Sequence, residues 1–195
     1  PVTLIAKMPI VYAVDARSKA KTLKEFVDLA KNGKMTYSTP GSGTTAHLMM
    51  ELLKYRSGMD LLHVPYKGAA PATLAALSGE TTFALVGAPP ALPHIASGKL
   101  AALAVTQPQR SPLLASVPTL GEALGLMQDD DFVAWYGLLV PARVPAEIVQ
   151  TLEKAATAAL RRPELRARLA ALGTDLLATP GAGFAERMRV ESRRY

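Results

Sequence analysis

The sequence contains no cysteine, so disulfide bonds and thiolate metal sites are excluded. Aromatic residues make up only 6% of the 195 residues. No apolar run reaches the ~18 residues that a membrane-spanning helix needs, and no signal peptide is visible. We therefore expect a protein that is not embedded in a membrane. The chain begins at Pro1, within a strand pattern and without a methionine, so we also expect a processed or truncated product.

Proline and glycine are plentiful, with 15 and 14 residues, which indicates many tight connections. Apolar residues make up 49% and charged residues 19%, as in globular proteins with a sizeable core. The net charge is +6. Its surplus is concentrated on amphipathic helical patterns without interleaved aromatics, so we interpret it as a solvated helical face. We do not expect nucleic-acid binding.

Short apolar strand patterns alternate with helical patterns in the first two thirds of the chain. Strands are predicted over 35–38, 61–64, 81–86 and 100–106, and a helix follows each of the first three. This alternation predicts βαβ units and a parallel sheet buried on both faces, which is an α/β fold.

The patterns at the two ends of the chain differ from this alternation of strands and helices. Residues 2–14 are predicted as one long strand or two collinear strands broken at Pro9, and 132–140 as another strand. Helices follow to the end, and the first has Ile148, Leu152 and Leu160 on one face. The acidic run 129–131 lacks an EF-hand pattern, so we interpret it as a solvated turn.

These patterns predict three segments. Residues 9–131 would form an α/β lobe, flanked by a hinge strand in 1–8 and by a hinge strand with C-terminal helices in 132–195. Two strands that enter and leave one lobe are what a two-lobed protein uses as a hinge. The other lobe would then be incomplete in this chain.

Three loops follow consecutive predicted strands, and the carboxyl ends of parallel strands share one edge of a sheet, where ligands bind. The first loop precedes a helix that Thr44 or Thr45 would cap, and a helix N-terminus attracts carboxylate or phosphate. Ordinary strand–helix turns are an equally weighted alternative. The candidate ligand-binding residues are Thr39, Gly41, Ser42, Gly43, Thr44, Thr45 and His47 in the first loop, Tyr66, Lys67, Gly68 and Ala69 in the second, and Gly87 and Ala88 in the third.

Other kinds of chemistry fail their own sequence tests. Residues 41–46 match the dinucleotide pattern G-x-G-x-x-A, but no acidic residue ends the next strand, and no Walker motif is present. Ser42 lacks a nucleophile elbow and a third triad member, and His47 with Glu51 lacks a third metal ligand. We therefore predict no catalytic residue, no metal and no cofactor. His47 is expected to orient the glycine turn, and His63 to be a satisfied core histidine.

Several segments together resemble the tripartite tricarboxylate transporter substrate-binding receptors, the Bug-type extracytoplasmic solute receptors. The resemblance covers essentially the whole chain. It rests on the runs YSTPGSGTTAHL (37–48), HVPYKGAAPA (63–72), ALPHI (91–95) and LAVT (103–106), and continues through WYGLLVPA (135–142).

The resemblance implies a type II periplasmic-binding-protein fold with two lobes, present here as one lobe plus the C-terminal helices of the other. It implies a periplasmic, non-enzymatic receptor that captures a small di- or tricarboxylate and delivers it to a membrane permease. Residues 39–45 would be the carboxylate loop, while 66–70 and 87–88 would line the cleft. Where the family commonly has an acidic residue after the third strand, this chain has Val86. An α/β enzyme acting on a nucleotide or acyl substrate is the alternative.

Overall fold

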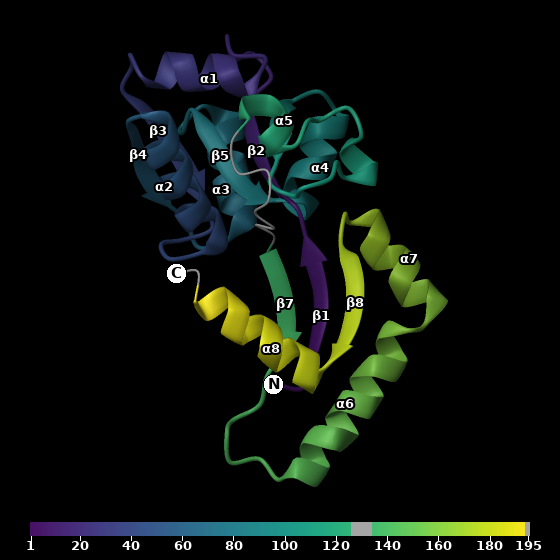
Figure 1. Ribbon diagram of the computed structural model, residues 1–195. Helices are drawn as coiled ribbons and strands as arrows, with labels where there is room; N and C mark the ends of the chain where they lie inside the picture. Colours follow the sequence, from purple (N-terminus) through teal and green to yellow (C-terminus); the bar gives the residue numbers. More distant parts are fainter. Residues whose placement is uncertain (126–133, 194–195) are drawn as a thin grey trace. The chain divides into compact units, whose positions relative to one another are not determined.

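The computed structural model describes residues 1–125 and 134–193, which fall into two compact units (Figure 1). The α/β unit comprises Pro9–Ala134, and the terminal unit comprises Pro1–Met8 together with Trp135–Tyr195. The predicted turn at 129–131 lies outside the described residues. Among the described residues, no helix combines the length and the apolar character needed to cross a membrane.

The α/β unit is built on a five-stranded sheet in the order β4-β3-β5-β2-β6. Strand β3 pairs in parallel with β4 and β5, whereas β2 pairs antiparallel with β5 and β6. The mostly parallel sheet is thus confirmed, with β2 as its one reversed strand. The elements are β2 (Ile10–Asp15), α1 (Leu23–Ala30), β3 (Met35–Thr39), α2 (Thr45–Ser57), β4 (Leu61–Pro65), α3 (Ala69–Ser78), β5 (Phe83–Gly87), α4 (Ala88–Ala96), β6 (Leu100–Val105), the 3₁₀ turn η1 (Pro112–Leu114) and α5 (Leu120–Leu124).

Alternate residues of the strands enter different parts of the core, as the period of two in a strand requires. Tyr12 of β2 and Phe83 of β5 join a cluster with residues of α1, α2 and α5. Their neighbours Val11 and Ala84 belong to two other clusters, which contain residues of α3 and α4. Burial on both faces of the sheet explains why its strands read as continuous apolar runs.

Local signals set the helix ends. Thr22 accepts a hydrogen bond from the Glu25 N–H, and the Glu25 carboxylate accepts one from the Thr22 N–H, which forms a capping box at the start of α1. Helix α2 begins after Thr44, whose hydroxyl accepts from the His47 N–H, and ends at Gly58 in the left-handed region.

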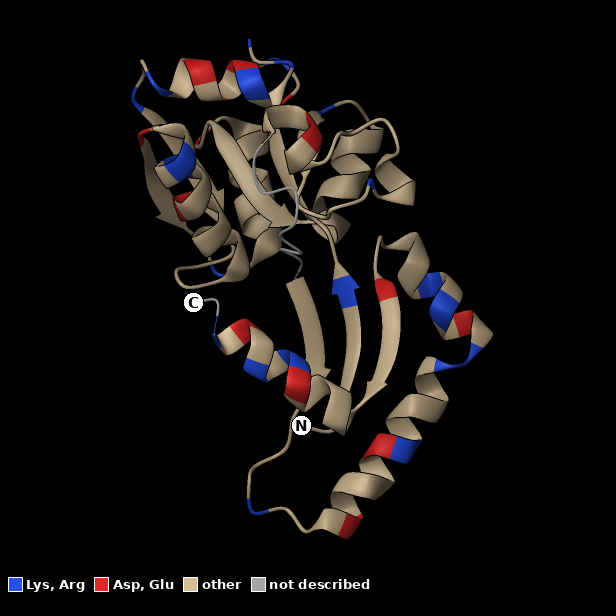
Figure 2. Cartoon of the chain, in the orientation of Figure 1, with Lys and Arg blue, Asp and Glu red and all other residues tan. Residues whose placement is uncertain are grey.

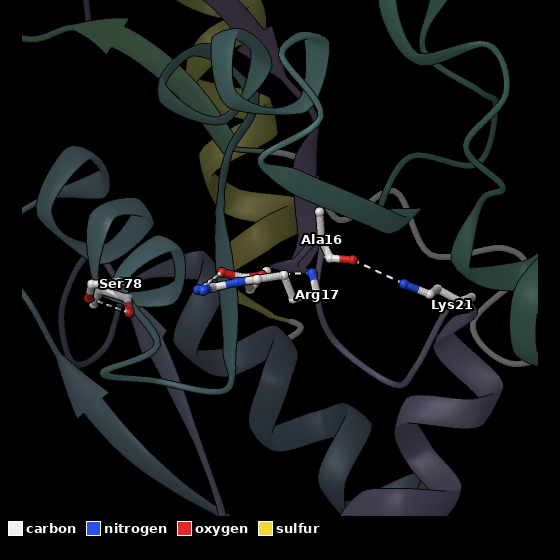
Figure 3. A network of polar contacts seen from close by, with 6 residues as sticks. Ala16, Arg17, Lys21 and Ser78 are labelled. Atoms are coloured by element: carbon white, nitrogen blue, oxygen red, sulfur yellow. Dashed lines mark hydrogen bonds and ion pairs between the residues drawn. The ribbon is translucent and has the colours of Figure 1, made fainter.

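The connection from β2 to α1 is held by polar contacts (Figure 3). The Arg17 guanidinium contacts both Asp15 oxygens, at 2.9 and 2.8 Å, and the Arg17 N–H donates to Asp15 Oδ1 at 2.7 Å. Lys21 Nζ donates to the Ala16 carbonyl at 3.0 Å. The hydrogen bonds from Arg17 hold the pKa of Asp15 at about 2.

We expect an NMR titration to place the Asp15 carboxyl pKa near 2, and the Arg17→Gln variant to return it toward the ordinary value of ~3.9. Because the folded-state pKa is depressed, Asp15 stabilises the fold above its unfolded pKa. That contribution is lost as the pH falls through the folded value. An Asp15 pKa that is the same in both proteins would show that the ion pair does not form in solution.

The terminal unit contains a three-stranded sheet in the order β7-β1-β8, in which β1 and β8 are antiparallel. Phe184 is fully buried against Trp135, with ring centroids 5.3 Å apart, and its ring occupies the space that a side chain at Gly137 would need. The elements are β1 (Thr3–Met8), β7 (Ala134–Leu138), α6 (Ala146–Leu160), α7 (Pro163–Ala171), β8 (Asp175–Pro180) and α8 (Gly181–Ser192).

Two expectations for the terminal elements can be compared with the structure. The predicted break at Pro9 is confirmed, because β1 ends at Met8, β2 begins at Ile10, and the two strands belong to different sheets. The predicted helix is α6, and its apolar face is largely exposed: Ile148 is 52% and Leu152 37% exposed, and Leu160 is its one buried residue.

Charge on the C-terminal helices is mixed in sign. Figure 2 shows Lys or Arg together with Asp or Glu on each of α6, α7 and α8. No residue of α7 is buried, so its arginines lie in solvent. This arrangement supports the interpretation of the basic surplus as a solvated helical face.

Candidate functional site

The first two predicted loops lie side by side at one edge of the α/β sheet. Strands β3 and β4 are parallel neighbours, with Thr39 opposite Pro65 at their ends. Beyond the strands, the Tyr66 N–H donates to the Thr39 carbonyl and the Gly68 N–H to the Pro40 carbonyl, each at 3.0 Å. The two loops therefore form one continuous backbone surface.

The glycine turn that links β3 to α2 is organised around the Gly41 carbonyl. The Thr44 hydroxyl donates to this oxygen at 2.7 Å, and the Thr39 hydroxyl lies 3.2 Å from it. Gly41 has φ +149° and Gly43 has φ +74°, a backbone that L side chains rarely adopt. Ser42 and Gly43 are exposed at the tip of the turn.

A group of backbone N–H groups at this edge has no acceptor among the described residues. Helix α2 leaves its first donors open, as helices do, and α3 begins after Gly68, which provides no side-chain cap. Both helix N-termini also carry partial positive charge. The open amides are those of Ser42, Thr45, Ala46, Ala69 and Ala70.

The third loop presents fewer open backbone N–H donors than the sequence predicts. Ala88 is only 1% exposed, and its N–H donates to the Pro9 carbonyl at 3.0 Å. The next two residues, Pro89 and Pro90, have no N–H. Ala88 therefore cannot present its amide to a ligand, and α4 supplies no open donor from its first three residues. The reason is a tertiary contact, because the carbonyl of Pro9, the residue before β2, accepts this hydrogen bond.

Side chains of the second loop point in different directions. The Tyr66 ring packs against the cluster of Ala72, Ala84 and Ala91, and its hydroxyl is buried. Burial raises the pKa of Tyr66 to about 12, and the negative charge of Glu80 acts in the same direction. Lys67, by contrast, is exposed. Tyr66 thus contributes backbone rather than its hydroxyl to the edge, and Lys67 is the cation of this loop.

A stack of rings lies under the glycine turn. His47 stacks on His63 with centroids 4.1 Å apart, and His63 stacks on Tyr37 at 4.8 Å. The Gly43 N–H donates to His47 Nδ1 at 3.1 Å, and His63 Nε2 lies 2.7 Å from the Thr39 hydroxyl. His47 therefore orients the turn, as the sequence predicts, while His63 is half-buried rather than in the core.

Tyr37, the last ring of the stack, contacts a carboxylate that also binds a lysine. The Tyr37 hydroxyl donates to Glu51 Oε1 at 2.5 Å, and Lys54 Nζ donates to the same oxygen at 2.9 Å. Burial alone would raise the pKa of Glu51, but these hydrogen bonds outweigh it and the pKa lies below its ordinary value. Sequence reasoning missed this network, because it depends on the register that places Tyr37 opposite His63.

Other chemistries find little support at this edge. Among the residues that the structure describes, no three potential ligands from His, Asp and Glu gather closely enough to hold a metal ion. Ser42, weighed above as a nucleophile, is exposed at the tip of the turn, and the His47 Nδ1 is engaged by the Gly43 amide. The arrangement is suited to holding an anion through backbone donors.

The fold is that of periplasmic solute-binding proteins. A family model described as tripartite tricarboxylate transporter family receptor matches residues 1–190. The protein BugT of Bordetella pertussis is 31% identical over 92% of the chain and 56% of its own length. The chain belongs to the tripartite tricarboxylate transporter receptors, a family of solute-binding proteins.

Two solved structures extend the comparison. R. palustris Rpa4515, solved with adipate, has a TM-score of 0.92 and 26% identity over all of this chain and 65% of its own. MatC of Rhodopseudomonas palustris, solved with bound malate, has a TM-score of 0.84 and 29% identity over 90% of this chain and 60% of its own. The chain thus spans between half and two thirds of the length of these relatives.

Proposed function

We propose that this chain is the ligand-gripping part of a periplasmic receptor that captures a small di- or tricarboxylic acid for a tripartite tricarboxylate-type permease. The observation that carries the proposal is the group of open amides on two adjoining loops at one edge of the sheet. The adipate and malate in the two similar structures support a carboxylate as the ligand class.

Backbone donors are sufficient for such a ligand. A hydrogen bond to a charged group contributes about 1.5–3 kcal/mol net, so several of them reach the roughly −8 kcal/mol of micromolar binding. The partial positive charges at the N-termini of α2 and α3 act on the same carboxylate. Lys67 at the rim adds attraction at longer range, which salt would screen.

Each of the two units is proposed to belong to a different lobe of the receptor. We assign the α/β unit as the second lobe, which holds the carboxylate, and the terminal unit as part of the first lobe. Strands β1 and β7, which connect to the α/β unit in the sequence, would serve as the hinge. In two-lobed receptors such hinges absorb the change in backbone angles on closure.

Calorimetry tests the proposal against the enzyme alternative. We expect adipate or malate to bind to the 195-residue chain, and to the longest natural form of the protein, with affinity that falls as salt rises. ATP and NAD, as representative nucleotides, should give no heat of binding. Binding of a nucleotide without binding of any di- or tricarboxylate would overturn the proposal in favour of an α/β enzyme.

A further inference from the structure

Two histidines make the hydrogen-bond contacts that position Gly41 and Gly43 of the glycine turn. His47 Nδ1 accepts the Gly43 N–H directly, at 3.1 Å. His63 acts through Thr39, whose Oγ1 lies 2.7 Å from His63 Nε2 and accepts the Gly41 N–H at 3.3 Å. Between these two glycines lies Ser42, one of the open amides. The positions of the turn donors therefore depend on both rings.

The hydrogen bond to Gly43 fixes the protonation state of His47. A backbone N–H can only donate, so Nδ1 must be unprotonated and the ring must carry its proton on Nε2. An imidazolium has a proton on both nitrogens, and it would face the Gly43 N–H with another donor. Protonation of His47 is therefore incompatible with the observed turn.

The surroundings of the His47 and His63 rings disfavour a positive charge on both rings at once. The two rings stack with centroids 4.1 Å apart and planes inclined by 18°. The other titratable or charged groups around them are Tyr37 of β3 and Glu51 and Lys54 of α2. Burial lowers the pKa of His63, the neighbouring His47 lowers it further, and Glu51 only partly compensates.

We propose that His47 and His63 are positioning residues for the glycine turn, and that the turn keeps its form for the carboxylate only while the His47 ring is uncharged, so that acidification weakens ligand binding. This inference rests on the proposed function and adds a pH dependence of definite sign. A histidine that only faced the ligand would make binding tighter on acidification, because an imidazolium attracts a carboxylate. The sign of the pH dependence therefore separates positioning from direct contact.

The first test needs no ligand. In a ¹⁵N-labelled chain at pH 8, we expect the His47 ring in the Nε2–H tautomer. On titration to pH 5.5, the Gly43 amide signal should shift with the same midpoint as the His47 ring. A His47 ring with its proton on Nδ1, or a Gly43 amide that ignores the titration, would overturn the inference whatever the ligand proves to be.

The second test uses affinity for adipate between pH 5.5 and 8. Loss of one neutral hydrogen bond predicts binding roughly 3- to 10-fold weaker at pH 5.5 than at pH 8. The His47→Asn variant places Oδ1 near the position of Nδ1 and does not titrate, so its affinity should fall less between pH 8 and pH 5.5 than that of the unmodified chain. His47→Ala should bind weakly at both pH values, and His63→Gln provides the parallel variant for the Thr39 contact.

The outcomes distinguish this inference from the proposed function. If no di- or tricarboxylate binds at any pH, the proposed function fails while the NMR titration still decides the role of the histidines. If adipate binds equally or more tightly at pH 5.5, or if His47→Ala binds like the unmodified chain, the receptor function stands and the positioning role is wrong.

Discussion

Replacing Phe83 with alanine is expected to lower the free energy of unfolding of the α/β unit by about 3–5 kcal/mol, the cost of removing a large ring from a packed core. Phe83 is fully buried on β5. Its ring stacks on the Phe26 ring, with centroids 4.3 Å apart. The centroid of the Tyr12 ring lies 5.8 Å from that of Phe83. The substitution therefore opens a cavity between the sheet and α1. Such a loss is a large share of the ~5–15 kcal/mol that stabilises a typical protein.

Urea denaturation followed by circular dichroism measures this effect. With an m-value of about 2 kcal/mol per molar, the midpoint should fall by roughly 1.5–2.5 M. Leu62→Ala is the control, because Leu62 is 68% exposed on β4 and its loss should change little. Trp135, the single tryptophan, lies in the terminal unit, so its fluorescence follows that unit separately. Equal midpoints for Phe83→Ala and Leu62→Ala would contradict the described core.

Replacing Gly43 with valine is expected to weaken carboxylate binding by roughly 10- to 100-fold, from about 1–3 kcal/mol of backbone strain. Gly43 has φ +74°, and no atom lies within 4 Å of where its Cβ would be. The cost therefore comes from the left-handed backbone, which a β-branched residue resists, rather than from a collision within the protein. The turn would rearrange, and the open amide of Ser42 would move with it. Calorimetry with adipate measures the loss.

Gly58→Val is the matched control for this substitution. Gly58 has the same φ, +74°, and the same open surroundings, but it ends α2 instead of preceding it. The 13-residue helix separates the two positions by ~20 Å. Both variants should lose similar stability, and only Gly43→Val should lose affinity. Equal affinities for the two variants would show that the glycine turn is not part of the site.

Local features of the fold were predictable because they depend on neighbouring residues. Thr22 with Glu25 identifies the start of α1, and Gly58 identifies the end of α2. The loops that follow β3 and β4 were also predictable, since short apolar runs followed by glycine-rich turns indicate βα connections. Their placement at one edge then follows from the parallel pairing of the strands.

Features that depend on distant residues were not predictable. The reversal of β2 follows from its pairing between β5 and β6. The donor expected from Ala88 is taken by Pro9, a residue far away in the sequence. The link from His63 to Thr39 requires the register of β3 against β4. A single sequence records none of these pairings directly.

We propose that open backbone amides on two adjoining loops bind an organic acid. A titration of the ¹⁵N-labelled chain with adipate and malate, followed by amide chemical shifts, would identify the amides that contact it. We expect the largest shifts at Ser42, Thr45, Ala46, Ala69 and Ala70. Amides at the opposite ends of the same helices, such as those of Gly58 and Gly79, should stay in place. Unchanged signals at Ser42 and Ala69, with ligand-induced shifts elsewhere in the chain, would contradict the claim.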